Sequence, residues 1–231
     1  MRDTPRREIR IIPVPGVPEV GEGDDLAALI VGAADELLGG DVLVVAHKVV
    51  SKAEGRVVPA VDRRAAARAE SARVLRRSGE MIISETRHGF VCANSGVDAS
   101  NAPEGRVVLL PVDPDLSARR LKERIAHLTG AEIAVVVSDT FGRAWRIGQT
   151  NVAIGIAGFQ PFVDYRGTTD TQGRELWATR IAIADELAGA AEMVMGKADG
   201  VCAAVVRGAP VTRGRGAATE LVRPPAGDLF R

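Results

Sequence analysis

Apolar and polar positions follow one another along this chain in a way that predicts successive strands and helices. Short apolar runs predict buried strands over residues 8–14, 41–50 and 132–140. Apolar residues at helical spacing predict helices between residues 26 and 37 and over residues 117–129. Glycine follows each helix, which is typical of helix C-termini. The pattern therefore predicts an α+β (mixed α/β) fold.

The remainder of the chain predicts shorter elements. Without an internal repeat or a low-complexity linker, we expect one domain over residues 1–231, built as two intimately connected lobes. The further elements are an exposed, arginine-rich helix over 62–77, strands over 81–84, 89–94, 107–112 and 177–183, a short helix that Asp185 caps and Gly196 follows, and a last strand over 201–206.

The charge balance narrows the range of partners. The 231 residues include 30 Lys plus Arg and 30 Asp plus Glu, so the formal net charge is zero with His neutral. A chain balanced in this way has no overall attraction to nucleic acid or to an anionic membrane. We therefore expect small-molecule ligands, and any phosphate group must be held by a local cluster of side chains.

The expected compartment is the cytoplasm. The first ten residues are highly charged and lack the apolar core of a signal peptide. No uncharged apolar run reaches the roughly 18 residues of a membrane span. Cys92 and Cys202 are too few for a disulfide framework, and their apolar surroundings are typical of small buried side chains.

Polar residues at the end of the strongest predicted strand are the first candidates for chemistry. Asp139 and Thr140 end the strand over 132–140, and ligands commonly lie at such strand ends in α/β proteins. Carboxylate and hydroxyl oxygens suit Mg²⁺ or Mn²⁺. Asp98 and Asn101 lie in a second polar loop, and two aspartates from separate loops can hold an ion against phosphate oxygens. Asp98, Asn101 and Asp139 are equally typical of simple turns, so both interpretations stay open.

Basic residues are the second group of candidates. Lys48 and Lys52 have the same parity and share one face if the strand over 41–50 continues, where they could neutralise phosphate. Arg143 and Arg146 follow Asp139 closely, and an arginine fork suits a carboxylate. A solvated strand end and a structural loop remain the respective alternatives.

Several common site signatures are missing from the sequence. No G-x-x-x-x-G-K-[ST] phosphate loop, no G-x-G-x-x-G dinucleotide motif and no G-x-S-x-G nucleophile elbow is present. The three histidines do not have the spacing of zinc ligands. The residues alone therefore predict a divalent-metal site beside basic side chains, with phosphate chemistry and no P-loop.

Longer motifs follow one another over nearly the whole chain, from residue 11 to the end. They are PVPGVPEVGEGDDL, DVLVVAHKVVSKAEGR, GFVCANSGVDASN, LLPVDPD, VVVSDTFGRAWRIGQTNVAIG, IADELAGAAEMVMGK and GDLF. In this order they resemble the coenzyme F420:L-glutamate ligases, the γ-glutamyl ligases of deazaflavin coenzyme biosynthesis.

The resemblance implies an enzyme that joins the amino group of L-glutamate to a carboxylate of the deazaflavin coenzyme precursor, at the expense of GTP. It implies dependence on Mg²⁺ or Mn²⁺, and leaves room for a monovalent cation such as K⁺. The implied protein is an intertwined homodimer with an α+β fold and no P-loop. Some bacterial relatives carry a C-terminal flavin-dependent reductase domain, which we do not expect in a chain that ends at Arg231.

The resemblance also assigns roles to individual residues. Asp98 and Asp139 would hold one metal ion and Thr140 a second, while Arg143 and Arg146 are candidates for glutamate. The implied GTP contacts are Val17, Pro18, Glu19, Val20, Lys52 and Asn101.

Two positions depart from the family pattern. His47 stands where relatives often carry serine, so only an imidazole N–H could contact GTP there. Lys197 stands where some relatives carry glutamine, which makes a metal contact at that point doubtful. Two alternative functions stay open: a related metal-dependent acyl-phosphate ligase for another carboxylate, and a non-catalytic GTP-binding regulator.

Overall fold

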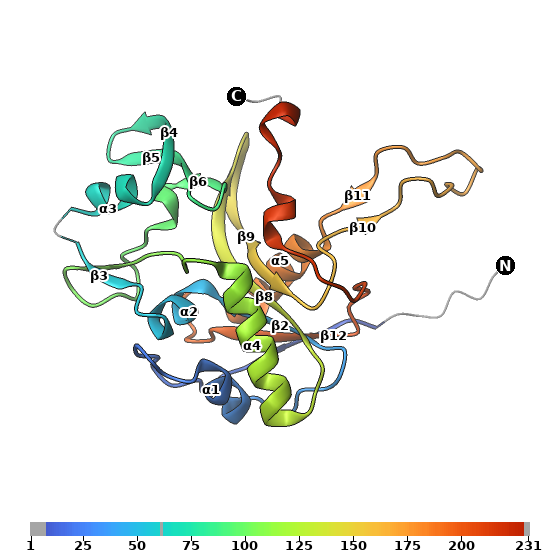
Figure 1. Ribbon diagram of the computed structural model, residues 1–231, viewed down its shortest axis with the longest axis horizontal. Helices are drawn as coiled ribbons and strands as arrows, with labels where there is room; N and C mark the ends of the chain where they lie inside the picture. Colours follow the sequence, from blue (N-terminus) through green and yellow to red (C-terminus); the bar gives the residue numbers. More distant parts are fainter. Residues whose placement is uncertain (1–7, 61, 229–231) are drawn as a thin grey trace.

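A five-stranded sheet runs through the middle of the protein (Figure 1). The computed structural model describes residues 8–60 and 62–228. One pair of neighbouring strands, β2 and β8, is parallel, and the other pairs are antiparallel. In spatial order the strands are β1 (Arg10–Pro13), β12 (Ala203–Arg207), β2 (Val42–Ala46), β8 (Ala134–Arg143) and β9 (Arg146–Ala157).

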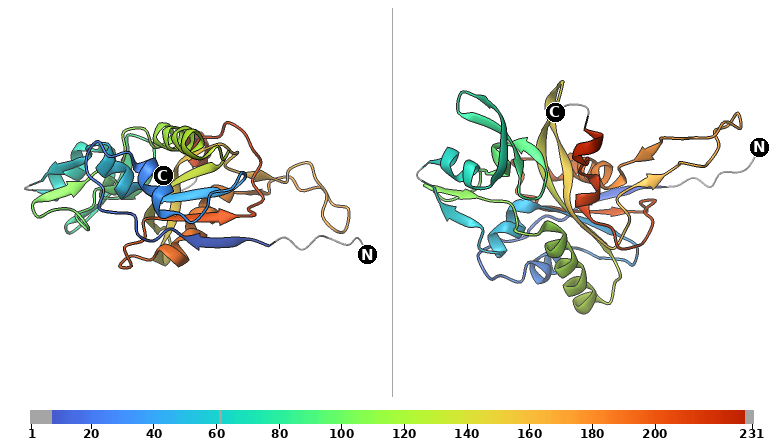
Figure 2. Two further views of the ribbon diagram at one scale, coloured as in Figure 1. Left: turned by 90° about the horizontal axis from the view of Figure 1, so that it is seen from below. Right: turned by 45° about the horizontal axis from the view of Figure 1, so that its top comes forward.

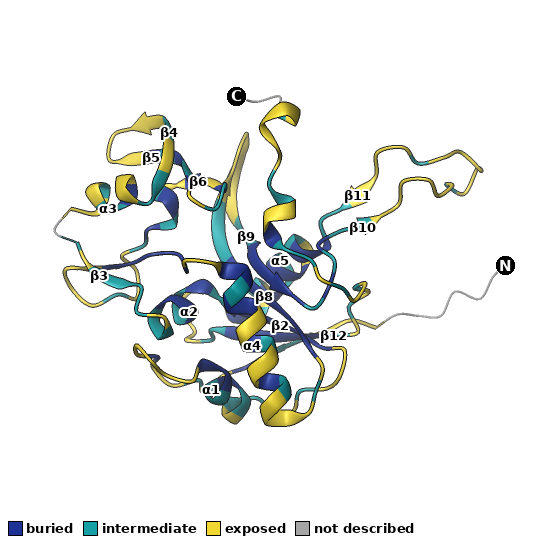
Figure 3. Cartoon of the chain, viewed as in Figure 1, coloured by how far each residue is buried: buried dark blue, intermediate teal, exposed yellow. Residues whose placement is uncertain are grey.

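Helices cover both faces of this sheet. On one face α1 (Leu26–Ala33) and α4 (Pro114–Thr129) pack over the odd-numbered residues of β2, and on the other α5 (Ile183–Met195) packs over the even-numbered ones. Because both faces are buried, β2 is apolar throughout instead of alternating with polar residues. Figure 3 shows the result as a continuous dark-blue band along the central strands.

A smaller apolar cluster lies beside the main sheet and includes Ala67, Ile82 and Val107. The mixed α/β class is thus confirmed, while the two-lobe arrangement and the homodimer stay predictions. The elements of this part are α3 (Arg63–Ala69), the three-stranded sheet of β4 (Ser71–Ser78), β5 (Met81–Thr86) and β6 (Val91–Ala93), and the strand pair of β3 (Val57–Pro59) with β7 (Arg106–Val108).

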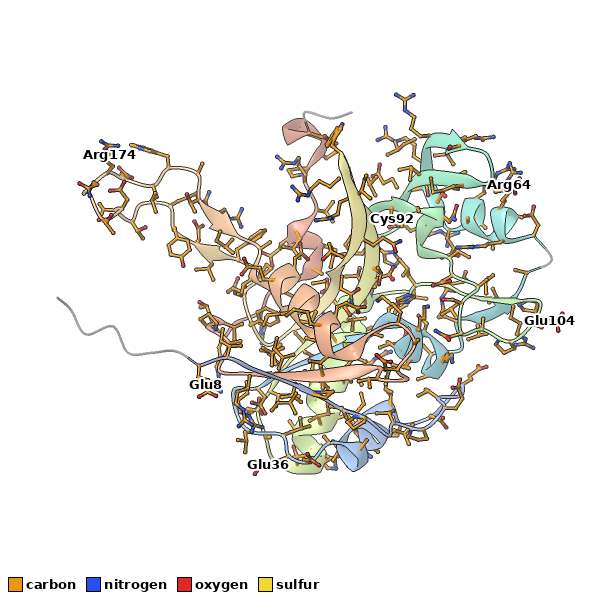
Figure 4. All side chains as sticks on the ribbon, turned by 180° about the vertical axis from the view of Figure 1, so that it is seen from behind. Glu8, Glu36, Arg64, Cys92, Glu104 and Arg174 are labelled. Carbon is orange, nitrogen blue, oxygen red and sulfur yellow. The ribbon has the colours of Figure 1, made fainter. Side chains whose placement is uncertain are left out.

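A long arm leaves the body of the protein between β9 and α5 (Figure 2). Its base is the antiparallel pair of β10 (Val163–Asp164) and β11 (Arg180–Ile181), and Figure 4 labels Arg174 near its far end. Short helices complete the chain: α2 (His47–Ala53), η1 (Asn94–Gly96), η2 (Ala218–Leu221) and η3 (Pro225–Gly227).

Two predicted elements were wrong in type. The strand expected over residues 41–50 ends at Ala46, and α2 follows at once with Val50 buried, so burial on a helix overrides the strand preference of valine. The helix expected over residues 62–77 ends at Ala69. Its second half is the strand β4, because pairing with β5 satisfies that backbone.

Other predictions were right in kind but wrong in extent. The first helix ends at Ala33, before the expected Leu37, and the strand over 107–112 ends at Val108. The strand over 177–183 is reduced to β11, since Ile183 already begins α5. Asp185 does not cap that helix: its side chain lies in the first turn and accepts a hydrogen bond from the backbone N–H of Ala153 (2.9 Å).

The helix predicted over residues 117–129 is α4, which ends as predicted at Thr129 but begins three residues earlier, at Pro114. Asp113 caps α4 by accepting from the N–H of Leu116 (2.8 Å), and Gly130 ends it in the left-handed conformation. The hairpin strand β9 was not predicted, because its start, with Gly148, Gln149 and Asn151, resembles a polar loop. Among the described residues no helix is both long and apolar enough to cross a bilayer. Residues 1–7, used for the signal-peptide prediction, and residues 229–230 of the GDLF motif lie outside the described ranges.

The packing of α4 on β9 depends on a glycine. A Cβ atom on Gly155 would lie 2.2 Å from the backbone carbonyl oxygen of Pro114, in the first turn of α4. We expect Gly155→Ala to lower the free energy of unfolding by about 1–3 kcal/mol, because backbone cannot move aside as a flexible side chain would. Urea denaturation of both proteins measures this.

The matched control is Gly142→Ala in the same hairpin, where a Cβ would meet nothing within 4 Å. Its stability should stay within about 0.5 kcal/mol of the wild type. Equal effects of the two substitutions would contradict the close approach at Gly155.

Candidate functional site

The parallel strands β2 and β8 end side by side, and the site begins there. Ala46 and Ser138 form their last paired residues, so the next residues, His47 and Asp139, are neighbours. His47 Nε2 lies 3.2 Å from Asp139 Oδ1. Since α2 begins at His47, this edge brings a carboxylate and the first turn of a helix together, where α/β proteins commonly hold ligands.

His47 is an unusual buried side chain. It is 2% exposed, and neither ring nitrogen has a hydrogen-bond partner, since the approach of Nε2 to Asp139 lacks hydrogen-bond geometry. Buried polar atoms normally have partners, so such an orphan is a marker of a functional position. His47 was predicted to lie inside a strand, but it is the first residue of α2. Its Nε2 atom, which has no hydrogen-bond partner, lies beside Asp139.

Asp98 reaches the same helix from a different loop. Its Oδ2 pairs with Lys48 Nζ (2.8 Å), and its oxygens accept from the N–H (2.7 Å) and the hydroxyl (2.9 Å) of Ser100. Burial acts to raise the pKa of Asp98, but the hydrogen bonds from Lys48 and Ser100 with the Lys48 charge leave it below its usual value. Asp98 and Asp139 therefore contact consecutive residues of α2.

The loop that precedes α1 also meets α2. Lys52 Nζ forms an ion pair with Glu19, in the segment 17–20 predicted to contact GTP. The prediction that Lys48 and Lys52 share a strand face was wrong in structure, yet residues four apart also share a helix face. Val17 is partly exposed, Pro18 and Glu19 are exposed, and Val20 is buried in the core.

Asn101 lies in the loop that Asp98 and Ser100 begin. It is exposed and has a left-handed backbone with φ of 56°, which asparagine tolerates better than most residues. Residues from the segment 17–20, from the loop 98–101 and from the end of β8 thus all surround α2. The structure brings most of the predicted nucleotide and metal residues to one region.

Thr140 is separated from Asp139 by the strand itself. Successive residues of a strand point to opposite faces, so Thr140 faces α5 while Asp139 faces α2. Thr140 Oγ1 donates to Asn151 Oδ1 (2.7 Å) on β9, and Lys197 Nζ, just beyond α5, lies 2.7 Å from the same hydroxyl. Lys197 also pairs with Glu192 of α5 (2.9 Å).

Arg143 and Arg146 lie at the far end of the β8–β9 hairpin, where they face each other in register. Both are exposed, and the guanidinium of Arg143 donates to the carbonyl of Ile147 (2.8 Å). Arg143 is four residues beyond Asp139, which is about 13 Å along a strand. Within one chain the structure does not bring these arginines to Asp139, and a role in glutamate binding stays a prediction.

A cavity of about 780 Å³ is lined in part by residues of the β8–β9 hairpin close to Asp139. Phe141, two residues beyond Asp139, and Val152, paired with Asp139 across the strands, both line it. Phe90 contacts Phe141 edge to face, with ring centroids 6.2 Å apart. The polar residues of its rim include Arg73, Arg76, Arg223 and Asp185. The cavity therefore offers aromatic walls and positive charge beside Asp139.

The sequence did not reveal these cavity residues or the partners of Thr140. Asn151 and Glu192 come from β9 and α5, whose approach to β8 no local pattern shows. Arg73 and Arg76 were assigned to the exposed helix predicted over residues 62–77. The parity of Asp139 and Phe141 on one strand was the only available signal.

The donor sets can be compared with the predicted metal ions. Within residues 8–60 and 62–228, no group of three or more His, Cys, Asp or Glu side chains is placed to hold an ion. Mg²⁺ is usually held by one or two carboxylates together with substrate phosphates. Asp98 and Asp139 are two carboxylates that could serve such a site if substrate phosphates supplied the remaining ligands, whereas Thr140 already contacts an ammonium group.

The fold and the site together define a mixed α/β protein that gathers acidic and basic side chains at the end of a parallel strand pair. The chain belongs to the F420-0:gamma-glutamyl ligase family, whose model matches residues 16–208. The resemblance found in the motifs is thereby confirmed.

Relatives of similar length support this membership. The chain is 43% identical to the coenzyme F420:L-glutamate ligase of Methanothermobacter thermautotrophicus, in an alignment covering 96% of this chain and 99% of the relative. It is 44% identical to that of Methanopyrus kandleri, covering 96% and 98%. For the ligase of Methanocaldococcus jannaschii the identity is 39%, covering 91% and 92%.

Cys92, on β6, reports on the interior beside Asp139 (Figure 4). Burial, with a smaller contribution from the Asp139 charge, raises the pKa of its thiol to about 12. At pH 8 this lowers the thiolate fraction about a thousandfold relative to an ordinary thiol, so we expect Cys92 to react far more slowly with a disulfide reagent in the native protein than in urea.

The measurement uses a Cys202→Ser background, because the half-buried Cys202 would otherwise contribute. The rate of the reaction is measured from the absorbance of the chromophore that the reagent releases. Equal rates in native and urea-unfolded protein would contradict the burial of Cys92.

Proposed function

We propose that this chain catalyses the GTP-dependent addition of L-glutamate to the coenzyme F420 precursor, as a cytoplasmic homodimer that uses Mg²⁺ or Mn²⁺. Family membership and the names of the relatives support the ligase reaction. The observation that carries the rest is the convergence of Asp98 and Asp139, from distant loops, on the first two residues of α2.

The surroundings of α2 suit a nucleotide phosphate chain. Lys48 and Lys52 lie on one face of the helix and now pair with Asp98 and Glu19, so both ammonium groups are positioned but have carboxylate partners. With GTP and a divalent ion bound, Asp98 would contact the ion, and both lysines would contact phosphate oxygens. In this proposal the segment 17–20, Lys52 and Asn101 contact GTP, and His47 lies against the same site.

The metal ion supplies charge neutralisation when bound, and Asp98 and Asp139 are the residues that would hold it. Their neighbours fit this role, because Lys48 lies beside one carboxylate and the unpartnered His47 nitrogen beside the other. A monovalent cation such as K⁺ remains part of the proposal without an assigned residue. Arg143 and Arg146 remain candidates for the glutamate carboxylates, although the hairpin end places them away from Asp139.

The cavity beside Asp139 is the proposed site of the deazaflavin ring. A planar heteroaromatic ring suits aromatic walls such as Phe90 and Phe141, since offset and edge contacts are both favourable. The arginines at the rim, Arg73 and Arg76 among them, suit the carboxylate that the precursor carries. Because Phe141 shares a strand face with Asp139, a precursor in this cavity would lie close to the proposed nucleotide site.

An acyl phosphate is the chemically simplest route. The carboxylate oxygen of the precursor attacks the γ-phosphorus of GTP, and the bond from that phosphorus to the bridging oxygen breaks to release GDP. The glutamate amino nitrogen then attacks the acyl carbon, phosphate leaves, and the proton of the amine passes to solvent. The residues of this chain bind, orient and shield the reactants from water.

The direct test incubates the full chain with GTP, Mn²⁺, L-glutamate and the precursor. Mass spectrometry should show the precursor heavier by a glutamyl unit, with GDP release that requires both glutamate and precursor. GDP release without that mass gain would support a ligase for another carboxylate. Nucleotide binding without any turnover would support a regulator.

Replacing the strand-end aspartate tests the metal assignment. Asp139→Asn keeps the shape of the side chain and removes its charge, so we expect turnover to fall at least about tenfold, roughly 1.4 kcal/mol of barrier. Initial rates at limiting Mn²⁺ provide the measurement. Near-normal rates would remove Asp139 from the metal site, and Asp164→Asn on the exposed arm is a control of equal charge change.

Reversing one charge at the cavity rim tests the deazaflavin site. Arg76→Glu should raise the KM for the precursor at least about tenfold, about 1.4 kcal/mol, and leave the KM for GTP unchanged, because the new carboxylate repels that of the precursor. Arg77→Glu is the matched control, since Arg77 is the next residue of β4 and does not line the cavity. Equal effects of both substitutions would exclude this cavity as the precursor site.

A further inference from the structure

Lys197 contacts Thr140, the residue that the family resemblance implied as a ligand of a second metal ion. Its ammonium nitrogen lies 2.7 Å from Thr140 Oγ1, 3.2 Å from Asn151 Oδ1 and 2.9 Å from Glu192 Oε2. These three oxygens come from β8, β9 and α5, so three elements of the main fold meet at one ammonium group. The ammonium donates hydrogen bonds to the first two oxygens and forms an ion pair with the third.

The same three oxygens form the kind of set that a hard divalent ion prefers. A hydroxyl, an amide carbonyl and a carboxylate are typical ligands of Mg²⁺ or Mn²⁺. The ammonium and an ion cannot both use them, because two cations at that separation repel each other strongly. The residues present at Thr140 therefore do not fit the second metal ion that the family resemblance implied.

We propose that the Lys197 ammonium is a built-in cation that replaces a second divalent ion at Thr140. The inference deepens the proposed function, on which it rests for the identity of the neighbouring site as a nucleotide–metal site. It predicts that the chain holds one divalent ion, at Asp98 and Asp139, and that the α5 face of β8 carries a fixed single charge.

The placement of Lys197 suits this role. Gly196 ends α5 with φ of 61°, a left-handed conformation that favours glycine, and the following side chain returns to Glu192 of the same helix. Asn151 donates to Glu192 (2.9 Å), so the carboxylate is held from two sides. The Lys197 side chain keeps 60% of its surface exposed, which leaves the ammonium within reach of a ligand phosphate.

Counting bound Mn²⁺ by electron paramagnetic resonance tests the inference without any turnover. Free Mn²⁺ is measured while the full chain is titrated, alone and with a non-hydrolysable GTP analogue. We expect Lys197→Gln to bind one Mn²⁺ per chain more than the wild type, because glutamine supplies an oxygen where the ammonium was. Equal counts in the two proteins, or two ions in the wild type, would overturn the inference.

Two controls separate charge at this position from charge elsewhere. Lys122→Gln removes a lysine that also lies 2.9 Å from a glutamate, Glu132, and should leave the count unchanged. Lys197→Arg keeps the positive charge and should also leave it unchanged. A gain of an ion in either control would contradict a specific replacement of metal by the Lys197 charge.

A second variant covers the case in which Lys197→Gln does not fold, which a thermal melt would show. Thr140→Val replaces the hydroxyl with a methyl group of similar size, so the Mn²⁺ count should equal that of the wild type, and loss of an ion would overturn the inference. The number of Mn²⁺ ions bound per chain also distinguishes the Lys197 inference from the proposed metal site at Asp98 and Asp139. No ion in the wild type and one in Lys197→Gln would support the Lys197 inference and contradict a metal at Asp98 and Asp139.

Discussion

The parallel pairing of β2 with β8 is the interaction on which the site depends. The pairing is in register from Val42 with Ala134 to Ala46 with Ser138, and it stops where β2 gives way to α2. His47 and Asp139 are neighbours for that reason alone. Helix α2 starts at the same point, so its two lysines can reach the loops that carry Asp98 and Glu19.

A second consequence of this strand geometry is the division of the site into two faces. The antiparallel partner β9 contains an irregularity between its pairings with Val137 and Ser138, where such bulges commonly redirect side chains beside functional sites. Beyond it Asp139 faces α2 and Thr140 faces the α5 side of the sheet. A protein with no net charge thus concentrates opposite charges on both sides of one strand end.

The charges around α2 are balanced pair by pair. Lys48 is paired with Asp98 and Lys52 with Glu19, and on the α5 side of β8 Lys197 is paired with Glu192 in the same way. Such pairs hold ionic groups in place without a net field, which keeps the groups ready for a phosphate ligand. They are partly exposed, so they add little to stability, and their value lies in positioning. The stability of the region comes from the valines of β2 and β8, which are fully buried.

Much of the site could be predicted because its chemistry lies at strand ends that the sequence marks clearly. The run that ends in Ser138, Asp139 and Thr140 is a strand because its valines are buried on both faces, and that burial is visible as an unbroken apolar pattern. The polar loop from Asp98 to Asn101 was recognised by composition. The family motifs then connected these segments, although neither pattern nor motif contains a distance.

The sequence by itself determined the apolar strands β2 and β8 of the main sheet, the helix α4 with its glycine C-terminus, and the residue types available to a phosphate and metal site. Local propensity and burial decide those features, and the order of apolar and polar residues in the sequence indicates both. Only the tertiary structure decided that α2 is a helix, that β4 is a strand, and that Lys197 lies against Thr140. Each of these depends on contacts between residues far apart in sequence, such as the pairing of β4 with β5 and of α5 with β9, whose energies outweigh local preference.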